Sequence, residues 1–268
     1  MGEIEYNTVG KGIPVLFIHG GHSNCNEIFC HKGFDLEKFQ LITPSRPGYG
    51  QTPLGKNKTP RDTADLIMKL VEHLCHKEIV VYGISAGGLT AIELAANYPD
   101  RVKKLILASA ISKKWLAKDG RMYRTSQIIF NPKIEKFTWR MVRFFSKILP
   151  NLVAKSFYSQ FSSNKDYKLS KSDIEELILA MKCYNSKTGF LNDIDQNIDD
   201  KTIAQIKCPT LIIHSANDNS VHLEHAKHSN SMIENSKIEI LHNEWGHLLW
   251  IGNESASAIK KTIEFIKE

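Results

Sequence analysis

The amino-acid sequence predicts an α/β protein, in which a mostly parallel central sheet is flanked by helices and interrupted by one helical insertion. Short apolar runs alternate with helical patterns along residues 1–110 and again along residues 207–268. Between them, residues 111–206 show helical patterns and no convincing strand. A chain of 268 residues is long enough for one large domain with such an insertion. We therefore expect a core of residues 1–110 and 207–268, and a helical cap, or lid, of residues 111–206.

The strands of this sheet are predicted by short runs of apolar, often β-branched residues between turn residues. An edge strand is expected at residues 2–9, before a Gly-Lys-Gly turn. Strands with long apolar runs are typical of a parallel sheet that helices cover on both faces. Further strands are expected at residues 13–18, 40–43, 79–82, 102–108, 210–214 and 237–241.

Helices are predicted between these strands. One begins after Thr59, a suitable N-cap, with Pro60 in the first helical position. Another follows residues 83–87 and ends before Pro99, since proline cannot continue a helix. Two more are expected near residues 223–232 and at residues 255–266.

The insertion is expected to contain helices at residues 133–149 and 173–181, the second capped by Ser170 or Ser172. Residues 133–149 carry two stripes at helical spacing. We expect the apolar stripe to face the core or a pocket and the basic stripe to face water. The apolar stripe is Ile134, Phe137, Met141, Phe145 and Ile148, and the basic stripe is Lys136, Arg140, Arg143 and Lys147.

The segment Gly83-Ile84-Ser85-Ala86-Gly87 matches G-x-S-x-G between a predicted strand and a predicted helix. Such a turn is so tight that Ser85 must adopt a strained backbone conformation, and glycines on either side leave room for it. The serine oxygen then stands above the sheet, at a helix N-terminus that favours negative charge. This context predicts that Ser85 is a nucleophile.

A serine hydroxyl needs a base to remove its proton, and the base needs a carboxylate to orient it. Asp218 lies in a polar turn after the strand at 210–214, and His247 follows the last predicted strand. Both should reach the sheet edge where Ser85 lies. His242 is the nearest rival base, but it stands at the strand end without an adjacent glycine.

An oxyanion intermediate needs backbone N–H donors. Ala86, which follows the nucleophile, should supply one, and the loop His19-Gly20-Gly21 should supply the other. We expect Gly21 to be the second donor and His22 to be the alternative. Candidates for contact with the substrate are His22, Trp115 and Leu248.

Composition limits the function further. No stretch approaches the roughly 20 apolar residues of a membrane span, no signal peptide is visible, and five scattered cysteines fit reduced thiols in the cytoplasm. We expect no metal and no organic cofactor, because neither HExxH nor paired CxxC occurs and no phosphate-binding loop is evident.

Charge is unevenly distributed along the chain. Residues 111–206 hold 17 Lys and Arg against 10 Asp and Glu, whereas the rest holds 18 against 19. Basic character confined to one segment argues against a nucleic-acid partner. We therefore expect a small-molecule substrate, with membrane contact open only through the basic helix of the cap. The sequence does not set the oligomeric state.

Taken together, these motifs make the chain similar to the α/β-hydrolase superfamily, in its common single-domain form with a helical cap. The resemblance covers nearly the whole chain: the His19-Gly20 loop, the Pro-Gly-Tyr-Gly loop at 47–50, the turn at 83–87, the Asp218 turn and Gly246-His247. One departure is Ser45, where the family often has a structural Asp. The serine excludes the dehalogenase and epoxide hydrolase branches, and His22-Ser23 disfavours proline iminopeptidases.

The resemblance implies a serine hydrolase that cleaves a carboxylic ester or thioester through an acyl-enzyme. Two alternatives remain open. The same triad could serve hydrolytic C–C cleavage or acyl transfer, or the fold could hold a ligand in a binding or signalling protein. Fold alone does not name the substrate.

Overall fold

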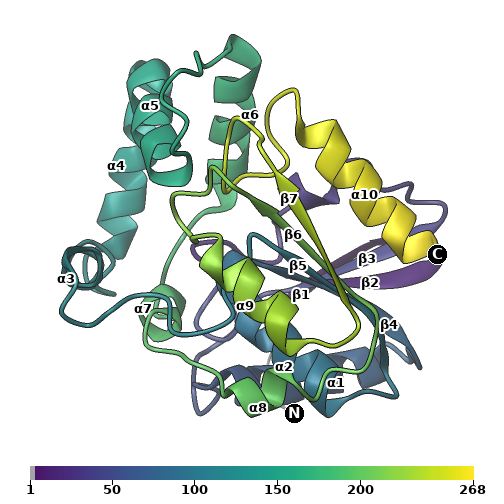
Figure 1. Ribbon diagram of the computed structural model, residues 1–268. Helices are drawn as coiled ribbons and strands as arrows, with labels where there is room; N and C mark the ends of the chain where they lie inside the picture. The colour runs from purple at the N-terminus through teal and green to yellow at the C-terminus, as the bar shows by residue number, and fades with distance from the viewer. Residues whose placement is uncertain (1–3) are drawn as a thin grey trace.

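The computed structural model describes residues 4–268 and has a seven-stranded sheet in the order β1-β3-β2-β4-β5-β6-β7 (Figure 1). All neighbouring strands are parallel except β1, which pairs antiparallel with β3. The predicted α/β class with a mostly parallel sheet is therefore confirmed. The strands are β1 (Tyr6–Gly10), β2 (Ile13–Ile18), β3 (Phe39–Pro44), β4 (Ile79–Ile84), β5 (Val102–Ala108), β6 (Thr210–Ser215) and β7 (Ser236–Leu241).

The first strand is shorter than its sequence pattern suggested. The prediction placed an edge strand at residues 2–9, and β1 begins only at Tyr6. Residues 2 and 3 of that prediction lie outside the described part of the chain. β1 is nevertheless at the edge of the sheet, as expected.

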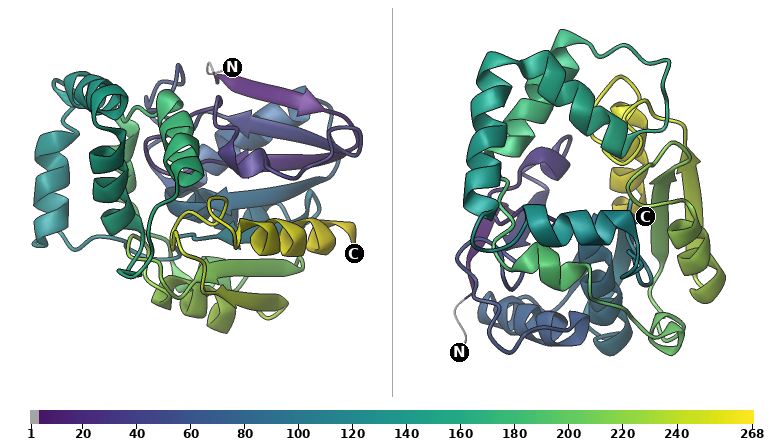
Figure 2. Two further views of the ribbon diagram at one scale, coloured as in Figure 1. Left: turned by 90° about the horizontal axis from the view of Figure 1, so that it is seen from above. Right: turned by 90° about the vertical axis from the view of Figure 1, so that its left-hand side faces the viewer.

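Helices cover both faces of the sheet (Figures 1 and 2). Along β2, Leu16 and Ile18 pack into one apolar cluster, and Val15 and Phe17 pack into another on the opposite face, because strand side chains alternate. The first cluster includes residues of α1 (Pro60–His73), α2 (Gly88–Asn97), α8 (Asp200–Ile203) and α9 (Glu224–Met232), and the second includes residues of α10 (Ser255–Lys267).

Local capping explains where α1 begins. The Thr59 hydroxyl accepts a hydrogen bond from the Asp62 N–H at 3.0 Å, and the Asp62 carboxylate accepts one from the Thr59 N–H at 3.2 Å. This reciprocal pair, with Pro60 in the first turn, satisfies N–H groups that a helix leaves without partners.

Five further helices lie between β5 and β6, within the segment predicted as a cap, and Figure 2 shows them to one side of the sheet. Ala154, Tyr158 and Leu177 from this segment pack against Trp245 and Leu248 of the loop after β7. The five helices are α3 (Arg121–Ile129), α4 (Glu135–Ile148), α5 (Pro150–Phe161), α6 (Lys171–Ala180) and α7 (Gly189–Asp193). We refer to these helices as the cap; through α5 and α6 they contact the loop that carries His247. Short 3₁₀ helices are η1 (Phe29–His31), η2 (Ser85–Gly87) and η3 (Met181–Cys183).

The prediction that the apolar stripe of α4 faces the core or a pocket is wrong. Phe137 is 60% exposed and Ile148 is 57% exposed, whereas Trp139 is buried. The inward side of α4 is set by polar contacts: the Trp139 indole N–H and the Glu135 carboxylate both hydrogen-bond Ser186. In the basic stripe, Arg143 is half-buried, and the other members are exposed as expected: Lys136, Arg140 and Lys147.

Candidate active site

Ser85 is the first residue of η2, directly after β4, and has a strained backbone at φ +49°. L-residues rarely adopt this left-handed region, so the surrounding structure must hold it there. Glycines make that possible: a Cβ at Gly83 would lie 2.5 Å from the Ala91 Cβ, and one at Gly87 would lie 2.3 Å from the Ile18 carbonyl oxygen. The G-x-S-x-G pattern is therefore a packing requirement of this turn.

Three side chains that are far apart in the sequence form one hydrogen-bonded chain. His247 Nε2 lies 3.0 Å from Ser85 Oγ, and His247 Nδ1 lies 2.8 Å from Asp218 Oδ2. A carboxylate can only accept, so the hydrogen-bond network assigns the ring proton to Nδ1. The Nε2 lone pair then faces the Ser85 hydroxyl. The rival, His242, does not hydrogen-bond Ser85 in the described structure.

The Asp218 carboxylate is held from several directions. Its Oδ1 accepts hydrogen bonds from the N–H groups of Ser220 at 2.9 Å and Val221 at 2.8 Å. His214 Nε2, from β6, lies 3.3 Å from Oδ2 and donates to the Val221 carbonyl at 2.8 Å. Burial alone would raise the pKa of Asp218, but the adjacent His247 and His214 outweigh it and lower that pKa below 3.8. Asp218 therefore remains an anion.

The backbone of His247 is fixed by the cap and the core. Its N–H donates to the Phe161 carbonyl at the end of α5, at 2.9 Å, and its carbonyl accepts from the Ser109 hydroxyl at 2.9 Å. A Cβ at Gly246 would lie 2.5 Å from the carbonyl oxygens of Asn217 and Phe161. Glycine is thus the residue that lets this loop approach both the Asp218 turn and the cap.

Two backbone donors lie near Ser85. Within residues 4–268, neither the Gly21 N–H nor the Ala86 N–H has a hydrogen-bond acceptor. The glycine loop lies against the serine, since a Cβ at Gly20 would be 3.0 Å from the Ser85 Cβ. The imidazole of His19 supports this loop by hydrogen bonds to the Gly20 carbonyl at 2.8 Å and the Arg46 N–H at 3.0 Å.

His22 belongs to an aromatic cluster with Phe130, Trp139 and Phe190, and its ring stacks on Phe190 at 3.8 Å between centroids. Its Nδ1 lies 2.7 Å from Ser186 Oγ, which also accepts from the Trp139 indole N–H at 2.7 Å.

The hydrogen bonds around Ser186 assign the His22 tautomer. The Ser186 hydroxyl proton has no acceptor other than His22 Nδ1 in the described chain. This network assigns the His22 ring hydrogen to Nε2, and burial keeps the ring neutral by lowering its pKa to about 3. The half-buried ring is a fixed N–H donor one residue beyond Gly21.

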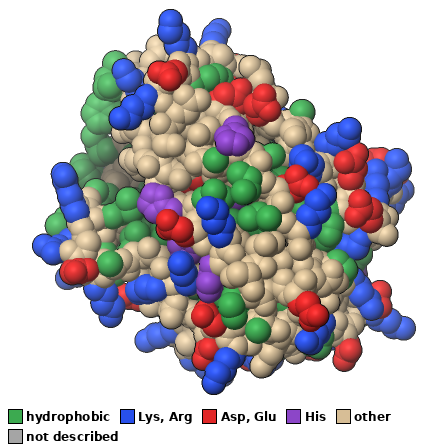
Figure 3. All heavy atoms as spheres, viewed as in Figure 1, with side chains coloured by type: hydrophobic (Ala, Val, Ile, Leu, Met, Phe, Trp, Pro, Cys, Tyr) green, Lys and Arg blue, Asp and Glu red, His purple; other side chains and the backbone are tan. Residues whose placement is uncertain are grey.

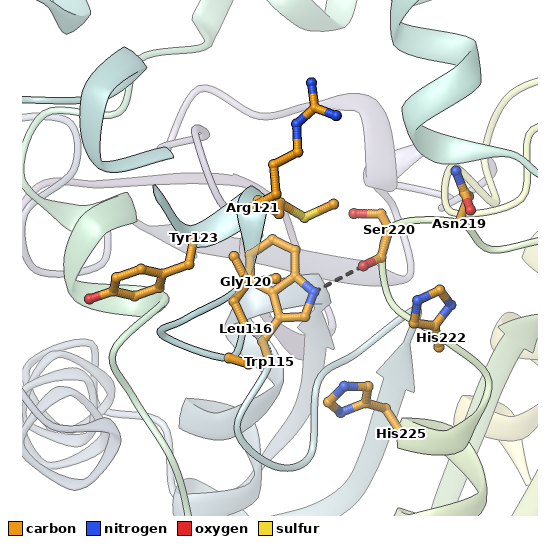
Figure 4. A pocket seen from close by; sticks show the side chains of 11 residues that line it. Trp115, Leu116, Gly120, Arg121, Tyr123, Asn219, Ser220, His222 and His225 are labelled. Carbon is orange, nitrogen blue, oxygen red and sulfur yellow. Dashed lines mark hydrogen bonds between the residues drawn. The ribbon is translucent and has the colours of Figure 1, made fainter. Parts of the chain in front are cut away.

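Trp115 and Leu248 occupy different surroundings. The Trp115 indole N–H donates to the Ser220 carbonyl at 2.9 Å, and its ring lines a cavity of about 220 Å³ beside the Asp218 turn (Figure 4). Tyr123 and His225 also line this cavity, whereas Ser85 does not. Leu248 is buried in the apolar cluster that joins the His247 loop to the cap.

A buried ion pair was not found by sequence reasoning. Arg46 follows β3 and Asp193 ends α7, and their side chains are 3% and 2% exposed. Both guanidinium Nη atoms contact the Asp193 carboxylate at 2.7 Å, and the Tyr49 hydroxyl donates to the same carboxylate at 2.6 Å. Arg46 Nε also donates to the His19 carbonyl at 2.8 Å. Through Arg46, the pair thus links α7 to the loop that precedes Gly21.

Ser45 departs from the family pattern, and the structure shows how the position is compensated. Its hydroxyl accepts from the Cys25 N–H at 2.9 Å and donates to Glu5 Oε2 at 2.7 Å. The same Glu5 oxygen accepts from the Gln51 N–H at 2.7 Å. A carboxylate from the segment before β1 therefore supports this loop. In the sequence, the absence of an Asp at position 45 was the sign that another residue supports this loop.

Metal-ligating residues do not cluster in this protein: within residues 4–268, no group of three or more His, Cys, Asp or Glu side chains could hold a metal ion. None of the helices of the described chain is long and apolar enough to cross a membrane.

Comparisons with known proteins agree with the fold. Residues 13–253 match the family model for the alpha/beta hydrolase fold. The chain is 36% identical to the uncharacterized hydrolase YcgS of Bacillus subtilis, over 99% of this chain and 95% of that protein. It therefore belongs to the α/β-hydrolase family.

Solved structures show the same fold. An alpha/beta hydrolase fold protein from Nakamurella multipartita has a TM-score of 0.79 and 26% identity, covering 98% of this chain and 95% of that chain. An esterase from Exiguobacterium antarcticum has a TM-score of 0.74 and 20% identity, covering 99% and 96%. At 20% identity, the match to the esterase supports the fold and nothing more.

Proposed function

We propose that this α/β hydrolase is a serine hydrolase that cleaves a carboxylic ester or thioester. The observation that carries this proposal is the chain of hydrogen bonds from Ser85 Oγ through His247 to Asp218, at 3.0 Å and 2.8 Å. Nucleophile, base and orienting carboxylate are the groups that acyl transfer requires, in the geometry that it requires.

In the first half of the proposed reaction, Ser85 Oγ attacks the substrate carbonyl carbon while His247 Nε2 takes the hydroxyl proton. Asp218 stabilises the imidazolium that forms. The tetrahedral intermediate then collapses, the bond to the alcohol or thiol breaks, and His247 returns the proton to the leaving group. Ser85 is left acylated.

In the second half, water attacks the acyl-enzyme and His247 takes its proton. The carboxylic acid leaves, and the proton returns to Ser85 Oγ, so atoms and charge balance. The oxyanion in both halves is assigned to the N–H groups of Gly21 and Ala86, which have no acceptor within residues 4–268. Each such donor contributes about 3 kcal/mol in well-formed sites.

His22 is proposed to help bind the substrate through Nε2–H. A neutral donor fixed by Ser186 can hydrogen-bond a substrate oxygen without taking part in proton transfer, since its pKa of about 3 keeps it uncharged. The aromatic rings around it favour an apolar acyl or alcohol group next to that oxygen. Trp115 is proposed to contact a more distant part of the substrate through the cavity that it lines, whereas Leu248 is buried between the His247 loop and the cap and is not proposed to contact it.

The test is hydrolysis of p-nitrophenyl esters and thioesters that vary in acyl length, with labelling by a serine-directed fluorophosphonate. We expect turnover by the wild type, labelling at Ser85, and loss of both in Ser85→Ala. Ser156→Ala, an exposed serine on α5, is the matched control and should behave as wild type. Labelling of another serine, or near-normal turnover by Ser85→Ala, would contradict the proposal. Labelling with negligible ester turnover would favour C–C hydrolysis, acyl transfer or ligand binding.

A further inference from the structure

The outer side of the cap exposes an unusual amount of apolar surface. Six large apolar side chains of α3, α4, α5 and the turn between α4 and α5 are 45–68% exposed. Single exposed apolar residues are ordinary, but a contiguous set on neighbouring elements marks an interaction site. We call this set the cap face: Ile128, Phe137, Phe144, Ile148, Leu149 and Leu152.

Helix geometry shows that the exposure of α4 is systematic. The buried residues Glu135, Trp139 and Ser146 define its inward side. Phe137 and Phe144 each lie two residues from one of these, which is about half a turn around an α-helix. The apolar side of α4 is therefore the side that points away from the protein, whereas a globular helix normally turns that side inward.

The same region is strongly basic. Residues 121–161 contain eight Lys or Arg and one acidic residue, Glu135, which is 1% exposed. On α4, Lys136, Arg140 and Lys147 are exposed and follow one flank of the apolar side at helical spacing. Figure 3 shows hydrophobic side chains gathered along the edge formed by α4 and α5, with basic side chains close to them.

We propose that the cap face docks on an anionic lipid surface. An apolar side flanked by Lys and Arg is the pattern of a helix that lies in a membrane interface, with apolar side chains among the acyl chains and the cations at the head groups. α4 has 14 residues, and no helix of the described chain could span a bilayer, so the helix would lie on the membrane.

Two other partners for this surface, a second copy of the chain and nucleic acid, fit it less well. A second copy of the chain would bring its own basic residues to the interface, with only the buried Glu135 to oppose them. Nucleic acid would match the charge, but the cap face includes aliphatic side chains such as Ile128 and Leu152, which bases do not stack on.

Docking would bring the candidate active site close to the lipid. The inward side of α4 contacts Ser186 through Trp139, and Ser186 contacts His22. One helix, roughly 10 Å across, therefore separates the cap face from the His22 side chain. The lipid-docking proposal stands on exposure and charge, and it does not depend on the reaction proposed above.

The experiment is co-sedimentation with large unilamellar vesicles of phosphatidylcholine alone or with 30% phosphatidylglycerol, a composition chosen to be about one-third anionic. We expect binding to the anionic vesicles that weakens as salt rises. Lys136→Gln/Arg140→Gln/Lys147→Gln should bind tenfold to hundredfold more weakly, since each such cation contributes about fivefold near an anionic surface. Phe137→Gln/Phe144→Gln/Ile148→Gln should lose most binding, because its insertion into lipid is lost.

Matched controls change the same chemistry elsewhere. Lys56→Gln/Lys69→Gln/Lys77→Gln removes three exposed lysines of the core, and Ile28→Gln removes an apolar side chain that is 61% exposed outside the cap. Both should bind like wild type. Thermal unfolding and labelling of Ser85 by fluorophosphonate should be unchanged in every variant, which shows that each is folded.

Three results would overturn the proposal. One is absence of vesicle binding by the folded wild type at low salt. Another is binding that the cap-face variants retain in full. The third is a dimer, or a complex with single-stranded RNA, that forms without vesicle binding and is abolished by the Phe137/Phe144/Ile148 variant.

Discussion

The Arg46–Asp193 pair offers a sharp test of how the cap is coupled to the core. Asp193→Asn keeps the shape of the side chain and removes its charge, which leaves the Arg46 guanidinium buried without a carboxylate. Arg46 would retain the carbonyl oxygens of His19 and Gly20 as acceptors, at 2.8 Å and 3.2 Å. Tyr49, which donates to the carboxylate at 2.6 Å, would lose a charged acceptor.

The expected cost follows from this burial. Breaking one partner of a buried pair costs about 3–5 kcal/mol, and an amide keeps part of the hydrogen bonding, so we expect about 3 kcal/mol. For a chain of 268 residues this lowers the unfolding temperature by roughly 6–12 °C. Burial alone would lower the pKa of Arg46, but Asp193 outweighs it and raises that pKa, so the arginine stays charged.

Urea unfolding monitored by tryptophan fluorescence measures this cost, and ester hydrolysis measures its effect on the site. Because Arg46 also holds the carbonyls before Gly21, we expect kcat/KM of folded Asp193→Asn to fall at least about tenfold. Asp195→Asn is the control: its side chain is 46% exposed and lies 3.8 Å from Lys114, so it should cost less than about 1 kcal/mol. Equal stability of the two variants would refute the structural reasoning.

The remaining predictions concern the proposed reaction and the response to pH. His247→Ala should lower kcat by roughly 10⁴–10⁶ in ester hydrolysis, because no base remains. Asp218→Asn should lower it by orders of magnitude while circular dichroism stays unchanged, and full activity would point to another acid. Exhaustive EDTA treatment should leave activity intact, and a loss that zinc restores would contradict this. Burial lowers the pKa of His225 to about 4 in the folded protein. As pH falls below 6.5, the unfolded chain therefore takes up a proton at this residue that the native chain does not bind. His225 should therefore lower the free energy of unfolding by about 2 kcal/mol between pH 7 and pH 5. The free energy of unfolding of His225→Gln should fall less over the same pH range.

Local signals predicted much of the fold. The predicted ranges 13–18 and 102–108 coincide with β2 and β5, and the Thr59-Pro60 start of α1 was found because capping is decided by neighbouring residues. Ser85, Asp218 and His247 were singled out because each follows a different strand of a parallel sheet, and such strand ends meet at one edge. The structure places them within hydrogen-bonding distance.

Long-range polar contacts could not be predicted in this way. Arg46 and Asp193 are 147 residues apart, and nothing near Asp193 distinguishes it from the other acidic residues of the cap. The prediction for the apolar stripe of α4 was wrong for a related reason. Periodicity locates an apolar side of a helix, but the direction of that side depends on what the helix packs against. Here Trp139 and Glu135 contact Ser186 from the polar side.

Ser45 shows how a site can keep its support when a familiar residue is absent. The Gln51 N–H of the loop at residues 45–52 donates to a carboxylate, and in the related family an Asp often stands at the first position of this loop. Here Glu5 provides the carboxylate from another segment. The Ser45 hydroxyl donates to this carboxylate and accepts a hydrogen bond from the Cys25 N–H. Gly50 accommodates the arrangement, since a Cβ there would collide with the Glu5 carboxylate. The support is therefore split between two residues 40 positions apart, and Glu5→Gln should disturb the loop more than Ser45→Ala does.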